Sequence, residues 1–165
     1  KPAEQTPLSA LKFAEILQQA GLPEGVVNIV PGYGPTAGAA LVKHPGVAKI
    51  AFTGSTAVGK QIMRDAADSL KKVSLELGGK SPNIVFADAD LDAAVRGAIN
   101  GIFYGKGEVC AAGSRLLVEK SIREPFLEKL TERASKLQVG DPLHPKTRVG
   151  ALVSAEQMNK VLGYI

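Results

Sequence analysis

The only cysteine of the chain, Cys110, lies in the glycine-rich run Gly107–Arg115. A single thiol cannot form a disulfide within the chain, so it is either an inert small apolar residue or a reactive group. Glycines at positions 105, 107 and 113 leave the backbone uncrowded, and the run follows a helical pattern instead of lying inside one. Because a thiol in an irregular segment is accessible, Cys110 is a candidate nucleophile, with core packing as the alternative.

A second candidate group is the carboxylate of Glu76, near the carboxyl end of the apolar run Val73–Leu77. Ligands of open α/β sheets collect at the carboxyl ends of the strands. A carboxylate flanked by leucines is costly to bury without a partner, and such a group is suited to act as a general base. The alternative interpretation is an ion pair with Lys72 or Lys80.

The run Gly54–Gly59 lies between a predicted buried strand and a predicted helix. Its backbone N–H groups and the helix N-terminus are suited to bind a phosphate. A plain strand-to-helix turn, with Ser55 or Thr56 as the helix cap, explains the same residues. The glycines of Gly32–Gly38 give only a weak dinucleotide signal, because the third one comes one position too late.

Metal binding has little support in the sequence. His44 and His144 both precede proline, and neither has a second ligand at a suitable spacing. The alternating carboxylates of Asp88–Asp92 lack the glycine and terminal glutamate of a calcium loop, and are better explained as the acidic start of a helix. We predict no metal site.

Composition narrows the functional class further. Of the 165 residues, 45% are hydrophobic and 22% charged, which is typical of a globular protein. The net charge of +4 is spread over the chain without a basic block, and tryptophan is absent, so nucleic-acid binding is not expected. No apolar run or signal pattern predicts a membrane partner. One cysteine favours a reducing, cytoplasmic location.

Apolar patterning predicts that helices and strands alternate in the first half of the chain. Such an order favours parallel strands joined by right-handed crossovers, and therefore an open, mostly parallel α/β sheet with flanking helices, similar to a Rossmann fold. The expected elements are a helix from Pro7 to Ala20, a strand over 26–30, a helix over 37–44, a strand over 49–53, a helix over 57–67, and strands over 73–77 and 83–87.

The regular alternation of helices and strands changes after Asp88. Asp90 is expected to cap a helix through Ile102 that leads directly to the cysteine, and a strand is expected over 115–118. Two capping-box pairs, Ser121 with Glu124 and Ser154 with Gln157, predict two further helices. We place the domain border at Gly78–Gly79, which divides the chain into residues 1–78 and part of a second α/β domain, residues 79–165.

Three segments, Phe52–Thr56, Leu75–Asn83 and Gly107–Arg115, resemble the NAD(P)-dependent aldehyde dehydrogenases in order and spacing. The resemblance extends over the whole chain. It implies that residues 1–78 are the C-terminal part of an NAD-binding domain and residues 79–165 the N-terminal part of a catalytic domain. Because the chain opens without a methionine and ends within a helical pattern, we expect an internal fragment.

The resemblance implies a role for each candidate residue. Cys110 would attack an aldehyde to give a thiohemiacetal and then a thioester, and Glu76 would activate the water that hydrolyses the thioester. Lys1 and Glu4 would hold the adenosine ribose, Pro35 and Val58 would enclose the adenine, and Gly54, Ser55 and Gly59 would bind the pyrophosphate of NAD. The expected cofactor site also includes Gly34, Thr56 and Leu77.

The same residues bear on the reaction class. The carboxylate of Glu4 would repel a 2′-phosphate, which favours NAD over NADP. The presence of Glu76 favours hydrolysis to a free acid over transfer to coenzyme A. The resemblance further implies a homodimer or homotetramer. Two alternatives stay open, a catalytically silent scaffold of the lens-crystallin type and an NADP-dependent semialdehyde dehydrogenase, although a silent protein has no need of Cys110 and Glu76.

One residue departs from the family pattern. Glu108 stands where the family usually has glutamine, two positions before Cys110, and the sequence leaves open whether it points toward the thiol or faces solvent. The resemblance also implies that the family's oxyanion-hole asparagine would precede residue 1. A segment that contacts the nicotinamide ribose would follow residue 165. We therefore expect little activity from residues 1–165 alone.

Overall fold

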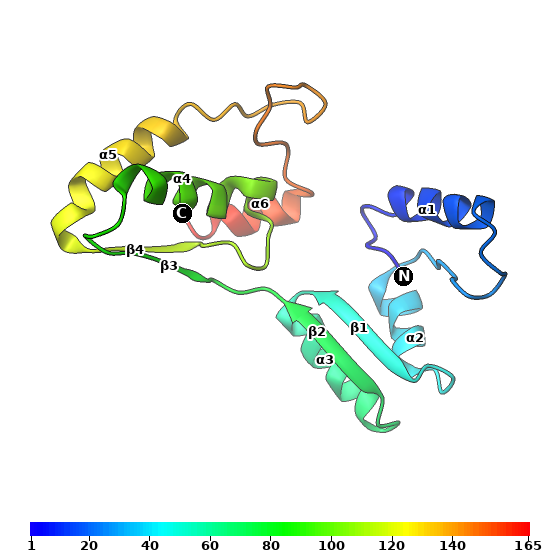
Figure 1. The fold of residues 1–165 in the computed structure, drawn as a ribbon. Coiled ribbons are helices and arrows are strands. Elements are labelled where there is room, and N and C mark those ends of the chain that lie inside the picture. Colours follow the sequence, from blue (N-terminus) through cyan, green and yellow to red (C-terminus); the bar gives the residue numbers. More distant parts are fainter. The chain divides into compact units, whose positions relative to one another are not determined.

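The computed structural model describes all residues from Lys1 to Ile165. They form two compact units, Lys1–Leu77 and Gly78–Ile165. Each unit contains one pair of parallel strands connected through a helix (Figure 1). The predicted α/β class with parallel strands is therefore confirmed. None of the helices combines the length and the apolar character that a membrane span requires.

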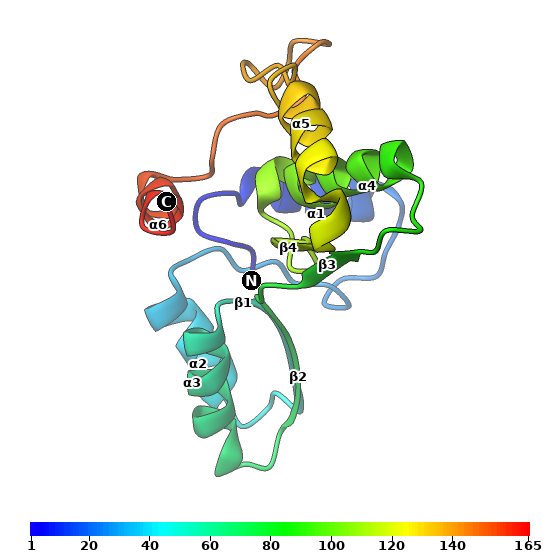
Figure 2. The same ribbon diagram turned by 90° about the vertical axis from the view of Figure 1, so that its left-hand side faces the viewer.

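In the first unit, strands β1 (Lys49–Gly54) and β2 (Lys72–Leu77) pair in parallel, and helix α3 (Thr56–Ala67) connects them. Figures 1 and 2 show α3 along one face of the strand pair. Ile62 and Ala66 are buried on α3. The helix therefore covers the strands with an apolar face, as periodicity predicts.

The remaining elements of the first unit are short or lie at its start. Helix α1 spans Leu8–Gln19, the π-helical turn η1 spans Gly34–Gly38 and helix α2 spans Ala39–Lys43. The ammonium group of Lys71 donates hydrogen bonds to the carbonyl oxygens of His44 (2.7 Å) and Val47 (3.0 Å). These bonds hold the loop after α2 against the start of β2.

Two local predictions for this unit are wrong. Residues 26–30 form no strand, because no other strand lies beside them to complete a ladder, and Val26 instead donates a backbone bond to the carbonyl of Pro23 within a turn. Val26 is 63% exposed, which rules out a buried position. Thr6 does not cap α1 either, since Pro7 occupies the cap position and makes no side-chain cap bond.

In the second unit, strands β3 (Pro82–Val85) and β4 (Arg115–Val118) pair in parallel, and helix α4 (Leu91–Phe103) connects them. A short 3₁₀ turn, η3 (Lys120–Ile122), leads into α5 (Arg123–Ala134), and α6 (Ala155–Leu162) lies near the end of the chain. The core joins strand β3 to helices α4 and α5 through four buried side chains: Val85, Val95, Ala98 and Phe126.

Local hydrogen bonds explain where the elements of this unit begin and end. Asp90 caps α4 by accepting a bond from the N–H of Ala93 (2.9 Å), and Ser154 caps α6 as predicted. The capping box at Ser121 is wrong, because its hydroxyl donates to Glu119 (2.9 Å) within the turn that precedes α5. Strand β3 ends at Val85, two residues early, since the N–H of Ala87 donates to the carboxylate of Glu119 instead of to a ladder.

Candidate active site

The predicted phosphate-binding turn lies where β1 ends and α3 begins. Ser55 is the helix cap, and its hydroxyl oxygen accepts a hydrogen bond from the N–H of Val58 (3.3 Å). Thr56 is the first helical residue, and the first turn contains no acidic side chain. A Cβ on Gly54 would lie 2.5 Å from Cζ of Phe52, so a side chain there would require the Phe52 ring to move. The turn therefore presents uncompensated N–H groups of a 12-residue helix.

Glu76 lies at the same edge of the strand pair. The parallel register sets Glu76 opposite Thr53 and Leu77 opposite Gly54. The side chain of Glu76 is exposed, and it makes no ion pair with Lys72. A free carboxylate at the carboxyl end of a parallel strand is available to accept a proton.

Gly59 and Leu77 explain how α3 approaches β2. Gly59 is buried, and a Cβ there would lie 2.8 Å from Cδ2 and 3.0 Å from Cδ1 of Leu77. The absence of a side chain therefore sets the spacing between helix and strand. Val58 points away from this contact and is exposed. Gly59 lies within one turn of the N-terminus of α3, so its contact with Leu77 also positions the predicted phosphate site.

The predicted ribose-binding residues also lie together. The carboxylate of Glu4 accepts a hydrogen bond from the N–H of Gly34, and a Cβ on Gly38 would lie 3.6 Å from Cδ of Lys1. Pro35 follows in the first turn of η1. A small hollow adjoins Glu4, and its lining residues are Ala3, Glu4, Pro7, Pro31, Gly32 and Tyr33. The structure thus brings Lys1, Glu4 and Gly34 to one place.

In the second unit, the cysteine loop follows α4 through three residues with left-handed backbone. Gly105, Lys106 and Gly107 have φ angles of 57°, 64° and 77°. Glycine adopts this conformation readily, whereas lysine loses roughly 1–2 kcal/mol in it. A Cβ on Gly107 would also lie only 3.2 Å from the carbonyl oxygen of Ile102. These residues turn the chain sharply away from the helix axis.

Cys110 occupies a turn that hydrogen bonds hold on its downstream side. The N–H of Ala112 donates to the carbonyl oxygen of Val109 (3.0 Å), and the N–H of Gly113 donates to Gly101 in α4 (3.0 Å). Ala112 is buried, whereas Cys110 is exposed. The backbone of the turn is therefore fixed while its thiol is accessible, which argues against the core-packing alternative.

Asn83 and Gly113 determine how the loop joins strand β4. A Cβ on Gly113 would lie 3.1 Å from Cβ of Asn83, so the loop passes close over β3. The side chain of Arg115 donates from Nε to the carbonyl oxygen of Lys80 (2.8 Å). Asn83 lies in the segment Leu75–Asn83, which resembles the aldehyde dehydrogenases. Its close packing against Gly113 was not predicted from the sequence.

The carboxylate of Glu108 is partly buried and has two partners. It lies 3.1 Å from Nζ of Lys106, and Oε1 accepts a hydrogen bond from the N–H of Val153 (3.3 Å). Sequence reasoning singled out Glu108 but missed Lys106 and Val153. The ion pair of Lys106 depends on a left-handed backbone, which a lysine in the sequence does not predict. Val153 lies 45 residues beyond Glu108, too far for a local pattern to connect them.

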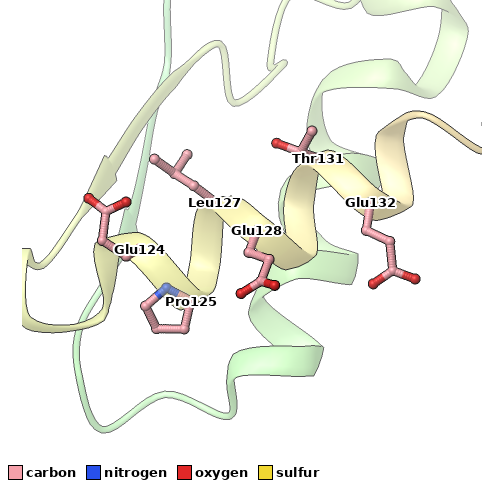
Figure 3. Close-up of a pocket in the computed structure, with 6 residues that line it drawn as sticks. All are labelled: Glu124, Pro125, Leu127, Glu128, Thr131 and Glu132. Atoms are coloured by element: carbon pink, nitrogen blue, oxygen red, sulfur yellow. The ribbon is translucent and has the colours of Figure 1, made fainter.

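The predicted catalytic pair is divided between the units. Glu76 belongs to Lys1–Leu77 and Cys110 to Gly78–Ile165. A separate shallow hollow on the outer face of α5 lacks a nucleophile or a cation (Figure 3). It is lined by Glu124, Pro125, Leu127, Glu128, Thr131 and Glu132. The hollow offers three carboxylates, those of Glu124, Glu128 and Glu132, but no thiol beside them.

Comparison with known proteins assigns the family. The sequence profile described as "Aldehyde dehydrogenase family" matches residues 1–165. Retinal dehydrogenase 2 of Mus musculus is 58% identical over 166 residues, which cover 100% of this chain and 32% of that protein. This chain therefore spans about a third of the length of the curated relatives that it matches.

Solved structures give the same result. The structure of HpcC from Thermus thermophilus matches with a TM-score of 0.96 and 55% identity, over 99% of this chain and 32% of that one. The NAD⁺ complex of aldehyde dehydrogenase from Bacillus cereus matches with a TM-score of 0.96 and 51% identity, over 99% and 33%. On these grounds the chain belongs to the aldehyde dehydrogenase family.

Proposed function

We propose that this chain supplies the nucleophile, the hydrolytic base and part of the cofactor site of an enzyme that oxidises an aldehyde to a carboxylic acid with NAD. The observation that carries the proposal is the exposed thiol of Cys110 in a turn with fixed backbone, within a chain whose full length matches the family. A nucleophile needs this combination of access and restraint.

The chemistry assigned to the two side chains has two stages. In the first, the thiolate sulfur of Cys110 adds to the aldehyde carbon, and the oxyanion of the resulting thiohemiacetal re-forms the C=O bond as hydride leaves, which gives the thioester. NAD, when bound, accepts that hydride. In the second, Glu76 takes a proton from water, the hydroxide adds to the thioester carbon, and the carbon–sulfur bond breaks to release the acid and the thiolate.

The residues of the first unit fit the cofactor. The N-terminus of α3 has no acidic residue in its first turn, and Gly54 and Gly59 allow the backbone to approach closely. An anionic pyrophosphate is stabilised by such a helix end. We assign Gly54, Ser55, Thr56 and Gly59 to the phosphates, Pro35 and Val58 to the adenine, and Lys1, Glu4, Gly34 and Leu77 to the rest of the cofactor site.

Selectivity for NAD over NADP is assigned to Glu4. Its carboxylate is held by the N–H of Gly34 beside a hollow, and a 2′-phosphate brought to that place would meet like charge. We expect Glu4→Gln to raise kcat/KM with NADP while reducing kcat/KM with NAD. A wild-type preference for NADP would contradict this assignment.

The catalytic assignment is tested by intact mass spectrometry of the full-length protein after incubation with an aldehyde and NAD. Glu76→Gln is expected to accumulate an acyl adduct on Cys110, because the thioester forms but loses its base. Cys110→Ser is the matched control and should remain unmodified. Turnover by Cys110→Ser at the wild-type rate would overturn the proposal.

The test also separates the silent-scaffold alternative. A scaffold would show neither turnover nor an adduct in the wild-type protein or in Glu76→Gln.

The family resemblance further supports a cytoplasmic homodimer or homotetramer as the assembly, and equilibrium sedimentation of the full-length protein would measure the number of subunits.

A further inference from the structure

We propose that Lys106 and Glu108 form a clamp that positions the Cys110 turn against the segment 150–153. Lys106 Nζ and a carboxylate oxygen of Glu108 lie 3.1 Å apart, and the other oxygen accepts a hydrogen bond from the N–H of Val153. The inference rests on the proposed function, because positioning matters only where Cys110 reacts. Both are positioning residues, since neither is assigned a contact with the substrate.

The clamp connects the upstream side of the turn to a segment far along the chain. Downstream of Cys110, the buried Ala112 and the bond from Gly113 to Gly101 fix the backbone. Upstream, the loop follows a short 3₁₀ turn, Tyr104–Gly107, which the N–H of Glu108 closes by donating to the carbonyl oxygen of Gly105 (3.1 Å). The Glu108 side chain therefore connects the upstream side to a distant segment.

The residues directly before the receiving segment are held by backbone hydrogen bonds. The N–H groups of Arg148 and Val149 donate to the carbonyl oxygen of Gln138 (2.9 and 3.2 Å), and Gly140 donates to Val149 (3.1 Å). A Cβ on Gly150 would lie 4.0 Å from Cδ of Lys106, so the aliphatic stem of the lysine also packs here. The clamp thus holds the loop at two adjacent points of one segment.

The backbone of Lys106 gives independent support. Its φ angle of 64° is one that glycine adopts freely and lysine adopts at a cost, and both neighbours are glycines. A lysine at this position needs a compensating role for its side chain. The ion pair supplies one, because the left-handed turn brings residues 106 and 108 to the same side of the loop.

The pair also differs from an ordinary surface ion pair. The side chains of Lys106 and Glu108 are only 30% and 21% exposed, so water screens them less than the other ion pairs of this unit, such as Glu132 with Lys136 (67% and 69%). Loss of either partner leaves a half-buried charge without compensation and frees the upstream side of the turn.

The test compares steady-state kinetics of full-length variants. Glu108→Ala and Lys106→Met should each lower kcat about 10- to 100-fold with KM for NAD changed less than about twofold, because a displacement near 1 Å suffices to misplace a nucleophile. The double variant should be no worse than the more severe single one. Glu108→Gln keeps an acceptor oxygen for the N–H of Val153 but places an amide NH₂ where Oε2 now faces Lys106, so its kcat should lie between those of the wild type and Glu108→Ala.

A second variant distinguishes positioning from simple loss of folding. Lys106→Gly removes the ion pair but relieves the left-handed backbone, so its melting temperature should stay closer to the wild-type value than that of Lys106→Met, while kcat falls about 10-fold. Glu132→Ala, which removes the solvent-exposed ion pair with Lys136, is the control and should have wild-type kcat.

The outcomes separate the two proposals. Wild-type kcat in Lys106→Gly or in Glu108→Ala overturns the clamp, whereas the adduct on Cys110 still supports the proposed function. An active Cys110→Ser variant overturns the proposed function itself. A fall in kcat that follows the melting temperature across all variants would show that the pair is only structural, and would likewise overturn the clamp.

Discussion

The two units contain the same local arrangement, a parallel pair of strands connected by a helix, but they carry their candidate residues at opposite ends of the strands. In the first unit, Ser55 and Glu76 lie at the carboxyl ends of β1 and β2. In the second, the Cys110 loop enters at the amino end of β4, where Arg115 pairs with Pro82. The same topology therefore presents its candidate residues in two different ways.

Charge at the helix N-termini explains part of the difference. The first turn of α3 contains no acidic residue, whereas α4 is capped by Asp90 and has Asp92 in its first turn. These carboxylates already compensate the partial positive charge of α4. Of these two connecting helices, α3 alone has an N-terminus without carboxylates in its first turn, which is the electrostatic reason for proposing the phosphate site there.

The largest expected effect tests whether the units are stabilised separately. Phe126 is 0% exposed in the core of the second unit, and the first unit has no large side chain buried as completely. Phe126→Ala should destabilise the second unit by about 3–5 kcal/mol, because it removes an aromatic ring and leaves a cavity. Hydrogen exchange measured by mass spectrometry should show loss of protection in β3, β4, α4 and α5 but not in β1 and β2.

The matched control for this prediction is Leu127→Ala, one residue further along α5 and 39% exposed, which should have a much smaller effect. Equal loss of protection in both units after Phe126→Ala would contradict the comparison. It would show that the two units unfold as one cooperative body.

The elements with long periodic patterns were predictable from the sequence, and those that depend on distant partners were not. Helix α4 and its cap at Asp90 follow from local residue types, as does the cap of α3 at Ser55. The apolar run 26–30 has the composition of a strand, yet a strand exists only where a second one pairs with it. Composition cannot supply that partner.

The candidate site shows the same division. Resemblance identified Cys110 and Glu76 because their motifs are local, and it drew attention to Glu108. The bond from Val153 to Glu108 joins residues far apart in the sequence, and the left-handed backbone of Lys106 contradicts the preference of its residue type. Neither feature has a local signal, so both required the folded chain.

A smaller effect is expected when one glycine is replaced by valine in each of the two connecting helices, α3 and α4, as separate variants. Gly59→Val places new atoms against Leu77, where even a Cβ would lie 2.8 Å away, and overpacking should destabilise the protein by about 1–3 kcal/mol. Gly97→Val in α4 meets nothing within 4 Å and should be neutral or stabilising by a few tenths of a kcal/mol, since valine favours helix over glycine.

Chemical denaturation measures both changes. The affinity for NAD should fall only in Gly59→Val, because displacement of α3 also displaces the proposed phosphate site. If both substitutions destabilised the protein equally, the close approach of α3 to β2 would not be the cause.

The helix caps allow a finer comparison. Ser55→Ala and Asp90→Ala each remove a side-chain acceptor for an N–H group of the first turn, so each should cost about 1 kcal/mol of stability. Only Ser55→Ala should also raise the Kd for NAD, measured by calorimetry, because Ser55 belongs to the proposed phosphate site. An equal change in Kd for both variants would remove the functional distinction between the two helix ends.

The smallest effect concerns ion pairs between helices. In the second unit, Lys129 of α5 donates a 2.7 Å hydrogen bond to Asp92 of α4, and this bond, together with the charge of Lys129, lowers the pKa of Asp92 below its usual value of 3.8. A carboxyl group with a lowered pKa stabilises the fold above that usual value, and the contribution is lost as the pH falls through the lowered pKa. The corresponding pair of the first unit, Lys43 and Asp65, is looser at 4.0 Å.

Asp92→Asn should therefore reduce the urea midpoint slightly near neutral pH, by more than Asp65→Asn does. The Asp92→Asn difference should vanish below the lowered pKa and shrink in high salt, since salt screens exposed charges. A difference that persisted in acid would assign the effect of the substitution to packing, because a protonated Asp92 can no longer form the ion pair.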